Sequence, residues 1–481
     1  MTDRNLPNSP KFATATPKFA TATRKSIART PKFVTPTPKF VRFAPKFVAA
    51  TPKSVTATLH GIADAENFVE DAARFGAGIR RRAARPTLCD FPRVPDFSPW
   101  PTRAASLVPC FQQNAPRIDH DGAVPIEEIS ALRDAGLLGA SAPREHGGAG
   151  LGTDAGSTLA LLETLWHVGR GNLSVGRLFE GHVNALQLVS WFGTSSQKER
   201  LFADALAGHL FGVWNTQAGD GVTLERNETC AGMRGSKTFC SGAPLVSRAV
   251  VTGEASGWQM AVVRLDETPA RFDASWWQTS GMRASASWRG DFSDLTLRDD
   301  DLLGGANDYY AQPAFSGGAI RFCAVQLGGA AALFEATRAF LVECGREDDT
   351  FQRARVGHIA TKVQAGWNWL QSAAQVWEAR GDAAQTVAFA AMMRLATEEI
   401  CTQTLEMAER SVGARGLMAP SAVERIGRDL TLYLKQPHLD EIPGRVGKFA
   451  LESDAPAHEL WSPCLSEGTS VEMGDAKGCG G

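Results

Sequence analysis

The chain has 481 residues, of which 43% are hydrophobic, and a formal net charge of −2. This length supports two or three domains with a buried core, and we expect no membrane span because no apolar run reaches the required length. The charge is uneven: residues 10–59 hold ten Lys or Arg and no acid, which leaves −12 for the rest and disfavours nucleic-acid binding.

The nine cysteines are scattered, without a CxxC pair or a Cys/His cluster. Free thiols in a reducing compartment are the plain interpretation, so we expect a cytoplasmic protein without a metal site or a disulfide framework. The sequence also contains no GxSxG nucleophile motif and no P-loop.

A seven-residue repeat occupies the basic stretch. Proline recurs every seven residues from Pro10 to Pro52, with Arg24 in the one missing slot, and Lys follows each position. Proline in nearly every heptad forbids a coiled coil, and the low aliphatic content predicts disorder. The alternatives are a basic tail for membranes or nucleic acid, a targeting peptide, and a tandem expansion or misplaced start codon without a role. With the Arg- and Pro-rich linker that follows, residues 1–103 are expected to precede the folded domains.

Residues 104–208 are predicted to form an N-terminal α domain. Pro125, followed by two acids, favours the start of a helix, because proline suits the first turn and acids complement the helix dipole. The glycines at 147–150 predict a turn, and residues 159–166 predict a further helix.

Residues 209–304 are predicted to form a middle β domain. Short apolar runs such as 249–252 and 260–263, bounded by Gly, Asp and Pro, are typical of strands in a small barrel or sandwich. Two stretches of this domain are candidates for holding a planar ligand, although a plain turn and an ordinary strand face are the simpler interpretations.

The first candidate stretch is the strand that delivers Trp214, Asn215 and Thr216 to a glycine-containing loop, where backbone amides can approach a phosphate or a flat ring. In the second, strand alternation puts Phe239 and Ser241 on one face, so that an aromatic ring and a hydroxyl lie side by side.

Residues 313–451 are predicted to form long helices, and residues 452–481 a flexible tail. The run 319–335 is apolar nearly all round, which predicts a buried helix. Gly413 and Gly416 predict a helix end with a tight turn, where another backbone or a phosphate can approach, or simply a helix C-cap.

The helix that starts near Arg428 is predicted to stop at Pro437, because proline removes a backbone donor and clashes with the preceding turn. Tyr433, Gln436 and Asp440 crowd around this break. It is either a plain helix end or the edge of an active site.

Together these segments resemble the acyl-CoA dehydrogenase family from about residue 104 to 451. Residues 135–150 look like its "GLLG…P.E.GG.G" turn, and residues 423–429 match "VER…RD". The resemblance implies an α+β fold with an N-terminal helical domain, a middle β-barrel or sandwich domain and a C-terminal four-helix bundle. It also implies FAD between the β domain and the bundle, and a homodimer or homotetramer.

The resemblance assigns site residues. Those implied to bind the cofactor are Trp214, Asn215, Thr216, Phe239, Ser241, Gly413, Arg415 and Gly416. Those implied to bind substrate are Arg321, Tyr433 and Gln436. The Gly413–Gly416 turn matches the family's Q-x-x-G-G-x-G, which approaches the flavin nucleotide of a neighbouring subunit.

The family's chemistry removes an α-proton from an acyl thioester with a glutamate and passes hydride to the flavin. The usual position of that glutamate, counted from Arg428, is Pro437, and the minority position before Arg321 is Ile320. Asp440 and Glu441, just past the break, are therefore the predicted bases. The flavin-contacting T-E-P run is also altered, because Gln217 replaces its glutamate.

We therefore predict an FAD-dependent oxidoreductase acting on the CH–CH group of an acyl-CoA-like thioester. The sequence identifies neither the acyl chain, nor the carrier, nor the electron acceptor. One alternative is a flavin monooxygenase on the same fold, since it needs no α-proton abstraction and tolerates the missing glutamate. The other is a binding or assembly protein that keeps the fold without catalysis.

Overall fold

The computed structural model describes residues 95–226, 230–379, 381–457 and 459–461. The predicted proline repeat, most of the linker and the Gly-rich end of the predicted tail lie outside the described residues.

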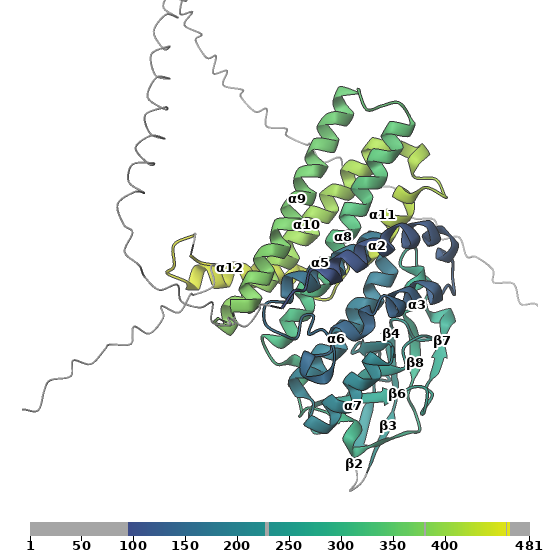
Figure 1. The fold of residues 1–481 in the computed structure, drawn as a ribbon, viewed down its shortest axis with the longest axis vertical. Coiled ribbons are helices and arrows are strands. Elements are labelled where there is room, and N and C mark those ends of the chain that lie inside the picture. Colours follow the sequence, from purple (N-terminus) through teal and green to yellow (C-terminus); the bar gives the residue numbers. More distant parts are fainter. Residues whose placement is uncertain (1–94, 227–229, 380, 458, 462–481) are drawn as a thin grey trace, which may run out of the picture. The chain divides into compact units, whose positions relative to one another are not determined.

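The N-terminal part is helical (Figure 1). Its α-helices are α2 Pro99–Asn114, α3 Ile126–Asp134, α4 Leu137–Ala140, α5 Thr158–Gly171, α6 Leu173–Phe192 and α7 Ser195–Leu206. The helix predicted after Pro125 is confirmed as α3. The linker prediction is wrong for residues 99–103, because α2 begins at Pro99 and buries Pro101 and Ala104. Asn172 begins α6 by accepting hydrogen bonds from the backbone amides of Ser174 and Val175.

The middle part contains two sheets. Its strands are β1 Phe211–Trp214, β2 Thr223–Arg226, β3 Cys230–Arg234, β4 Ser236–Cys240, β5 Arg248–Glu254, β6 Trp258–Arg264, β7 Arg271–Asp273, β8 Trp288–Asp291, β9 Leu295–Arg298 and β10 Leu302–Leu303. The larger sheet has the order β10-β6-β5-β2-β3-β9, with β1 paired in parallel to β5, and the smaller has the order β4-β8-β7. The strands predicted at 249–252 and 260–263 are confirmed as β5 and β6.

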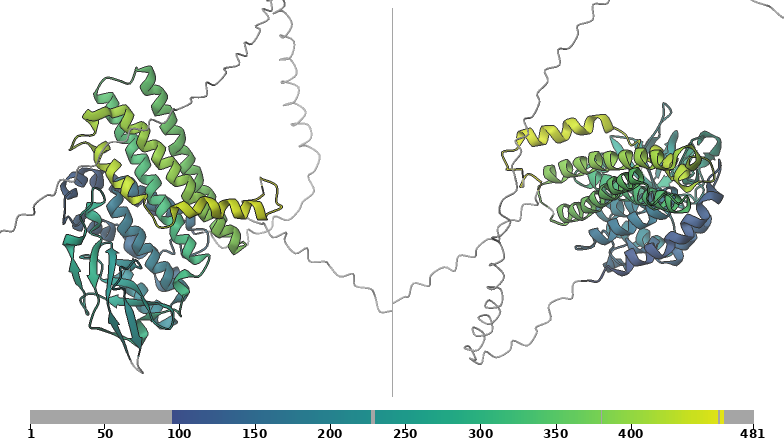
Figure 2. Two further views of the ribbon diagram at one scale, coloured as in Figure 1. Left: turned by 180° about the vertical axis from the view of Figure 1, so that it is seen from behind. Right: turned by 90° about the horizontal axis from the view of Figure 1, so that it is seen from above.

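Long helices follow the sheets and rise above them in Figure 1. They are α8 Ala314–Glu343, α9 Thr350–Ala379, α10 Ala383–Gly416 and α11 Ala422–Tyr433, and the shorter α12 Ile442–Glu452 packs on α10 (Figure 2). The prediction of a flexible tail is wrong near its first residues, because the ring centroid of Trp461 lies 5.2 Å from that of Phe449 on α12.

Helix α8 contains the buried helix predicted over 319–335, which is confirmed. It is the one helix of the described residues that is long and apolar enough to cross a membrane, so the expectation of no such run is wrong. Its most apolar window is 78% buried within the protein, which makes it a core helix. A Cβ on Gly328 of α8 would lie 2.2 Å from the carbonyl oxygen of Trp166, so α8 and α5 are in backbone contact at this point.

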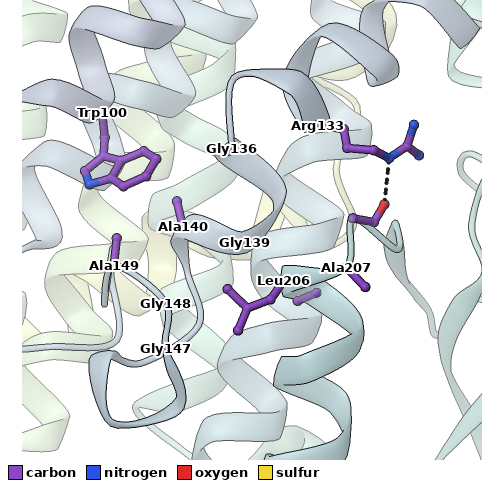
Figure 3. A pocket seen from close by; sticks show the side chains of 12 residues that line it. Trp100, Arg133, Gly136, Gly139, Ala140, Gly147, Gly148, Ala149, Leu206 and Ala207 are labelled. Atoms are coloured by element: carbon purple, nitrogen blue, oxygen red, sulfur yellow. Dashed lines mark hydrogen bonds between the residues drawn. The ribbon is translucent and has the colours of Figure 1, made fainter.

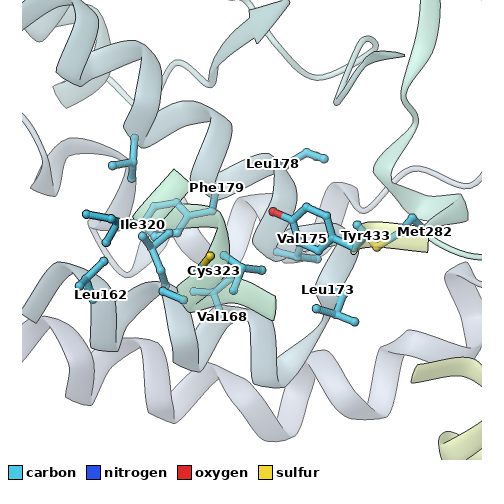
Figure 4. Packing of buried hydrophobic residues seen from close by; sticks show 14 of the residues in the cluster. Leu162, Val168, Leu173, Val175, Leu178, Phe179, Met282, Ile320, Cys323 and Tyr433 are labelled. Carbon is cyan, nitrogen blue, oxygen red and sulfur yellow. The ribbon is translucent and has the colours of Figure 1, made fainter. Parts of the chain in front are cut away.

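Helix α6 joins the sheets to the C-terminal helices, because it contacts both β1 and α8. Figure 4 shows part of the core on this helix, where Val175 and Phe179 of α6 lie close to Cys323 of α8 and to Tyr433 of α11. The polar contacts of α11 connect the C-terminal helices to the N-terminal part and to the β domain. Arg428 pairs with Asp119, and Asp429 accepts a 2.5 Å hydrogen bond from the backbone amide of Met282.

Candidate functional site

A cavity of about 680 Å³ lies where the end of β1, helix α6, the first turns of α8, helix α10 and the segment after α11 meet. Much of its wall is apolar, and seven aromatic residues contribute to it: Trp191, Phe239, Tyr309, Tyr310, Phe315, Phe322 and Phe449. A space of this size and character suits a small organic molecule.

Helix α6 carries a polar face into the cavity. Arg177, Glu180 and Asn184 are spaced three and four residues apart, so they share one side of the helix. Glu180 is only 1% exposed and accepts hydrogen bonds from both Arg177 and Asn184, one on each carboxylate oxygen. This pairing engages the Glu180 carboxylate and leaves it poorly suited to abstract a proton.

Arg321 of α8 extends this network from the other side. Its Nε donates a hydrogen bond to Oδ1 of Asn184, and its guanidinium lies over the ring of Trp191. The residue is 5% exposed, and burial lowers its pKa to about 10, against an opposing effect of Glu180. Among the described residues no carboxylate lies within ion-pair distance of Arg321; the ion pair of Glu180 is made with Arg177.

The loop after β1 forms another wall of the cavity through Asn215 and Thr216. Lys237, fully buried on β4, donates from Nζ to the backbone oxygen of Asn215 at 3.0 Å, to Oε1 of Gln217 at 2.7 Å and to Oγ1 of Thr252 at 3.2 Å. Burial lowers the pKa of Lys237 to about 8. These bonds fix the loop to the sheet beneath it.

Phe239 also lines the cavity, but the alternation predicted for its strand is wrong. Its φ of 56° and a register shift between Lys237 and Cys240 interrupt β4. Phe239 is therefore 47% exposed, with its edge against Trp276 and Trp277, whereas Ser241 is buried and hydrogen-bonded to Ser287. The two side chains do not share one surface.

The break after α11 reaches the cavity through Gln436, Pro437 and His438. Arg394 of α10 holds this segment by donating from Nη2 to the carbonyl oxygen of Pro437 at 2.8 Å. His438 has a φ of 64°, and the chain then turns into a short 3₁₀ helix, η7 Leu439–Glu441.

The two predicted bases lie in η7, and neither belongs to the cavity lining. Asp440 and Glu441 are both exposed to solvent. Glu441 pairs with His438 at 3.1 Å and with Arg445 at 2.9 Å. The turn at His438 therefore directs both acids away from the place where a base would be needed.

A second, smaller cavity of about 320 Å³ lies among the glycine turns of the N-terminal domain (Figure 3). Trp100, Leu206 and backbone atoms form most of its wall, and its one charged side chain, Arg133, donates from Nε to the carbonyl oxygen of Gly208 at 2.9 Å. Its lining holds no acid, thiol or imidazole, so we assign no chemistry to it.

Two family models match the chain on either side of the β domain. The model of the acyl-CoA dehydrogenase N-terminal domain matches residues 110–209, and that of the C-terminal domain matches residues 320–435. The chain belongs to the acyl-CoA dehydrogenase family. The predicted resemblance and the predicted fold, with helical, sheet and helical parts in that order, are therefore confirmed.

Individual relatives within this acyl-CoA dehydrogenase fold differ in what they do. A dibenzothiophene monooxygenase from Mycolicibacterium goodii is 24% identical over 73% of this chain and 94% of its own length. The crystal structure of dibenzothiophene monooxygenase from Paenibacillus sp. A11-2 superposes with a TM-score of 0.66 at 20% identity, over 76% of this chain and all of that one. Butyryl-CoA dehydrogenase from Megasphaera elsdenii gives 0.66 at 18% identity over the same shares.

The structure brings only some of the predicted site residues together. Asn215, Thr216, Phe239, Arg321 and Gln436 line the large cavity.

Five others are buried or lie at a different end of the fold. Trp214 is buried and donates from Nε1 to the carbonyl oxygen of Ser241. Tyr433 lies in the core beside Val175 and Met282 (Figure 4), and burial raises its pKa well above its ordinary value. Gly413 and Arg415 are exposed at the end of α10, with Gly416 buried beside them, and none of the three reaches the cavity.

Sequence reasoning missed Arg177, Glu180, Asn184 and Arg394. The first three had a detectable signal, because they are regularly spaced polar residues on a helix whose remaining side chains are nearly all buried. Arg394 had none, because one arginine on a long helix is most often a solvated side chain.

Proposed function

We propose that this protein is a flavin-dependent monooxygenase that oxygenates an apolar or aromatic small molecule. The observation that carries the proposal is the helix break, where proline occupies the family's usual catalytic position and the nearest acids, Asp440 and Glu441, lie outside the lining. The two acids that do line the cavity, Glu180 and Glu452, are both paired with cations.

The chemistry explains why this absence favours oxygenation. Acyl-CoA dehydrogenation needs a carboxylate to take the α-proton of the thioester. Oxygenation needs no such base. One atom of O₂ enters the substrate, the other leaves as water, and the two electrons come from reduced flavin. A separate reductase that uses NAD(P)H would supply the reduced flavin.

The cavity residues fit a flavin. The exposed ring of Phe239 offers a flat apolar surface, and Thr216 offers a hydroxyl that makes no hydrogen bond within the described residues. Buried Lys237 lies under the same loop and contributes positive charge, which favours a reduced, anionic ring system. The resemblance favours FAD, whereas a solved structure of the same fold, that of the Paenibacillus monooxygenase, contains FMN.

We further propose that the exposed turn at Gly413 and Arg415 serves a second copy of the chain. In the family this turn approaches the flavin of the neighbouring subunit, which explains why these residues do not reach the cavity of their own chain. A homodimer or homotetramer would then complete the flavin site.

The test begins with flavin released by heat from purified protein and identified as FAD or FMN by chromatography. We expect oxygen consumption and an oxygenated product when reduced flavin from an NADH-dependent reductase is supplied with benzothiophene or indole. Anaerobic bleaching of the bound flavin by an acyl-CoA panel would overturn the proposal in favour of a dehydrogenase. A protein that takes up no added flavin would favour the binding or assembly alternative.

A further inference from the structure

Arg321 is a buried cation without an adjacent counter-charge. It is 5% exposed and lines the large cavity, and its one hydrogen bond within the described residues goes from Nε to Asn184. Its two terminal nitrogens therefore keep their donors free toward the cavity. A guanidinium withdrawn from water without an anion is costly, so such a residue in a ligand cavity indicates the charge of the ligand.

A count of the buried charges around Arg321 also indicates a negatively charged ligand. Arg177 and Arg321 lie on one side of the cavity with a single carboxylate, that of Glu180, between them in the network. Glu180 makes its ion pair with Arg177 and reaches Arg321 only through the amide of Asn184. One positive charge is left over, and one negative charge on the ligand would balance it.

The rest of the lining defines the remainder of the ligand. The ring of Trp191 lies against the guanidinium of Arg321, with a centroid distance of 6.0 Å. Tyr309, Tyr310 and Phe315 contact one another, with ring centroids 5.0–5.6 Å apart. They lie between β10 and the first turn of α8. Aromatic walls next to a cation suit a flat apolar body that carries an acidic group.

We propose that the substrate is an aromatic or similarly apolar molecule with one anionic group, a carboxylate or sulfonate, that pairs with Arg321. This inference rests on the proposed function, because it names the substrate class of the same cavity. The anionic group acts as the anchor and orients the apolar body; it does not take part in oxygen transfer.

Arg394 is the competing candidate for the anchor. It lines the cavity from α10, its Nη2 donates to the carbonyl oxygen of Pro437, and its Nε has no hydrogen-bond partner within the described residues. It is only partly buried, whereas Arg321 is buried, so the missing anion costs less there.

The test compares two probes of nearly equal shape, benzothiophene and benzothiophene-2-carboxylate, by isothermal titration calorimetry on the full chain loaded with flavin. We expect the carboxylate to bind at least tenfold more tightly at neutral pH. Equal affinities, or tighter binding of the neutral probe, would overturn the anionic-substrate proposal. Because calorimetry needs no turnover, oxygen consumption with the neutral compound would still uphold the proposed monooxygenase.

Variants locate the anchor. Arg321→Gln should abolish the preference for the carboxylate, and Arg321→Lys should retain part of it, since the charge remains but the planar donor pair is lost. Arg338→Gln is the matched control, because Arg338 lies on the same helix, is exposed and is remote from the lining. Preference that survives in Arg321→Gln, or disappears only in Arg394→Gln, would overturn the assignment to Arg321.

Discussion

Nζ of Lys237 lies 2.7 Å from Oε1 of Gln217, at the position where the family's T-E-P run carries a glutamate. The lysine is fully buried, and its acceptors within the described residues are neutral: an amide, a backbone carbonyl and a hydroxyl. The loop that lines the cavity is therefore fixed by a buried cation that has lost its anion.

Gln217→Glu should restore an ion pair under this loop. A charge-assisted hydrogen bond is stronger than a neutral one, so we expect the free energy of unfolding at pH 7 to rise by about 1–3 kcal/mol. Urea denaturation of parent and variant measures the difference. Gln217→Leu is the control in the other direction, since it removes the acceptor and should lower stability. A variant with glutamate that is no more stable than the parent would contradict this account of Lys237.

The same substitution should change the alkaline pH dependence of stability. Burial lowers the pKa of Lys237 to about 8, below its ordinary value of 10.5, so between these values the unfolded chain binds more protons than the folded one. The contribution of this group to the free energy of unfolding therefore rises from pH 8 to 10.5 in the parent. Glutamate at 217 raises the folded pKa and should flatten the rise, as denaturation series at pH 8 and pH 10 would reveal.

Gly328→Ala should destabilise the protein strongly. The new methyl group would lie 2.2 Å from the carbonyl oxygen of Trp166, so α5 and α8 would have to move apart. We expect a loss of about 1–3 kcal/mol in thermal or urea unfolding. Gly357→Ala is the matched control, because Gly357 is an exposed helical glycine on α9 with nothing within 4 Å of a new Cβ. It should be neutral or stabilise by about 0.5–1 kcal/mol, and equal effects at both sites would contradict the close packing.

The element types were predictable where the sequence carries a strong local pattern. The acids after Pro125 and the apolar run at 319–335 gave helices that the structure confirms as α3 and α8. Phe239 was different, because its outward position depends on a bulge and a positive φ, and neither follows from alternating side chains.

The cavity was harder to predict than the elements. Its polar network joins Glu180 of α6 to Arg321 of α8 through Asn184, and the sequence separation of 137 residues between Asn184 and Arg321 hides that contact. Counting along the chain also placed Asp440 near the site, although the left-handed turn at His438 directs the following acids outward.

His182 should make the protein less stable in mild acid. It is fully buried on α6, where Nε2 contacts the carbonyl oxygen of Leu138 and Nδ1 accepts from the amide of Phe211, an arrangement that requires the neutral ring. Burial lowers its pKa to about 4. The unfolded chain, with a histidine pKa near 6.5, therefore binds more protons between pH 6.5 and 4, and stability falls as pH decreases through that window.

The expected loss from this histidine between pH 7 and pH 5 is about 2 kcal/mol. His182→Gln retains a donor and an acceptor without titrating, so its unfolding free energy should change correspondingly less over the same range. Urea titrations of both proteins at the two pH values provide the comparison. A variant with the same acid sensitivity as the parent would show that other groups, such as His167, cause the loss.

Asp440→Asn and Glu441→Gln should leave turnover within about twofold of the parent, because both side chains are exposed and neither lines the cavity. If either were the base for α-proton abstraction, its loss would lower kcat by about 10²-fold or more. Steady-state rates with the best oxygenated substrate, and separately with an acyl-CoA panel, measure both cases. Glu441→Gln also removes the ion pairs to His438 and Arg445. Because exposed ion pairs contribute little to stability, we expect only a small decrease in the free energy of unfolding. A collapse of kcat in either variant would return the catalytic role to the acids beyond the break and favour the dehydrogenase alternative.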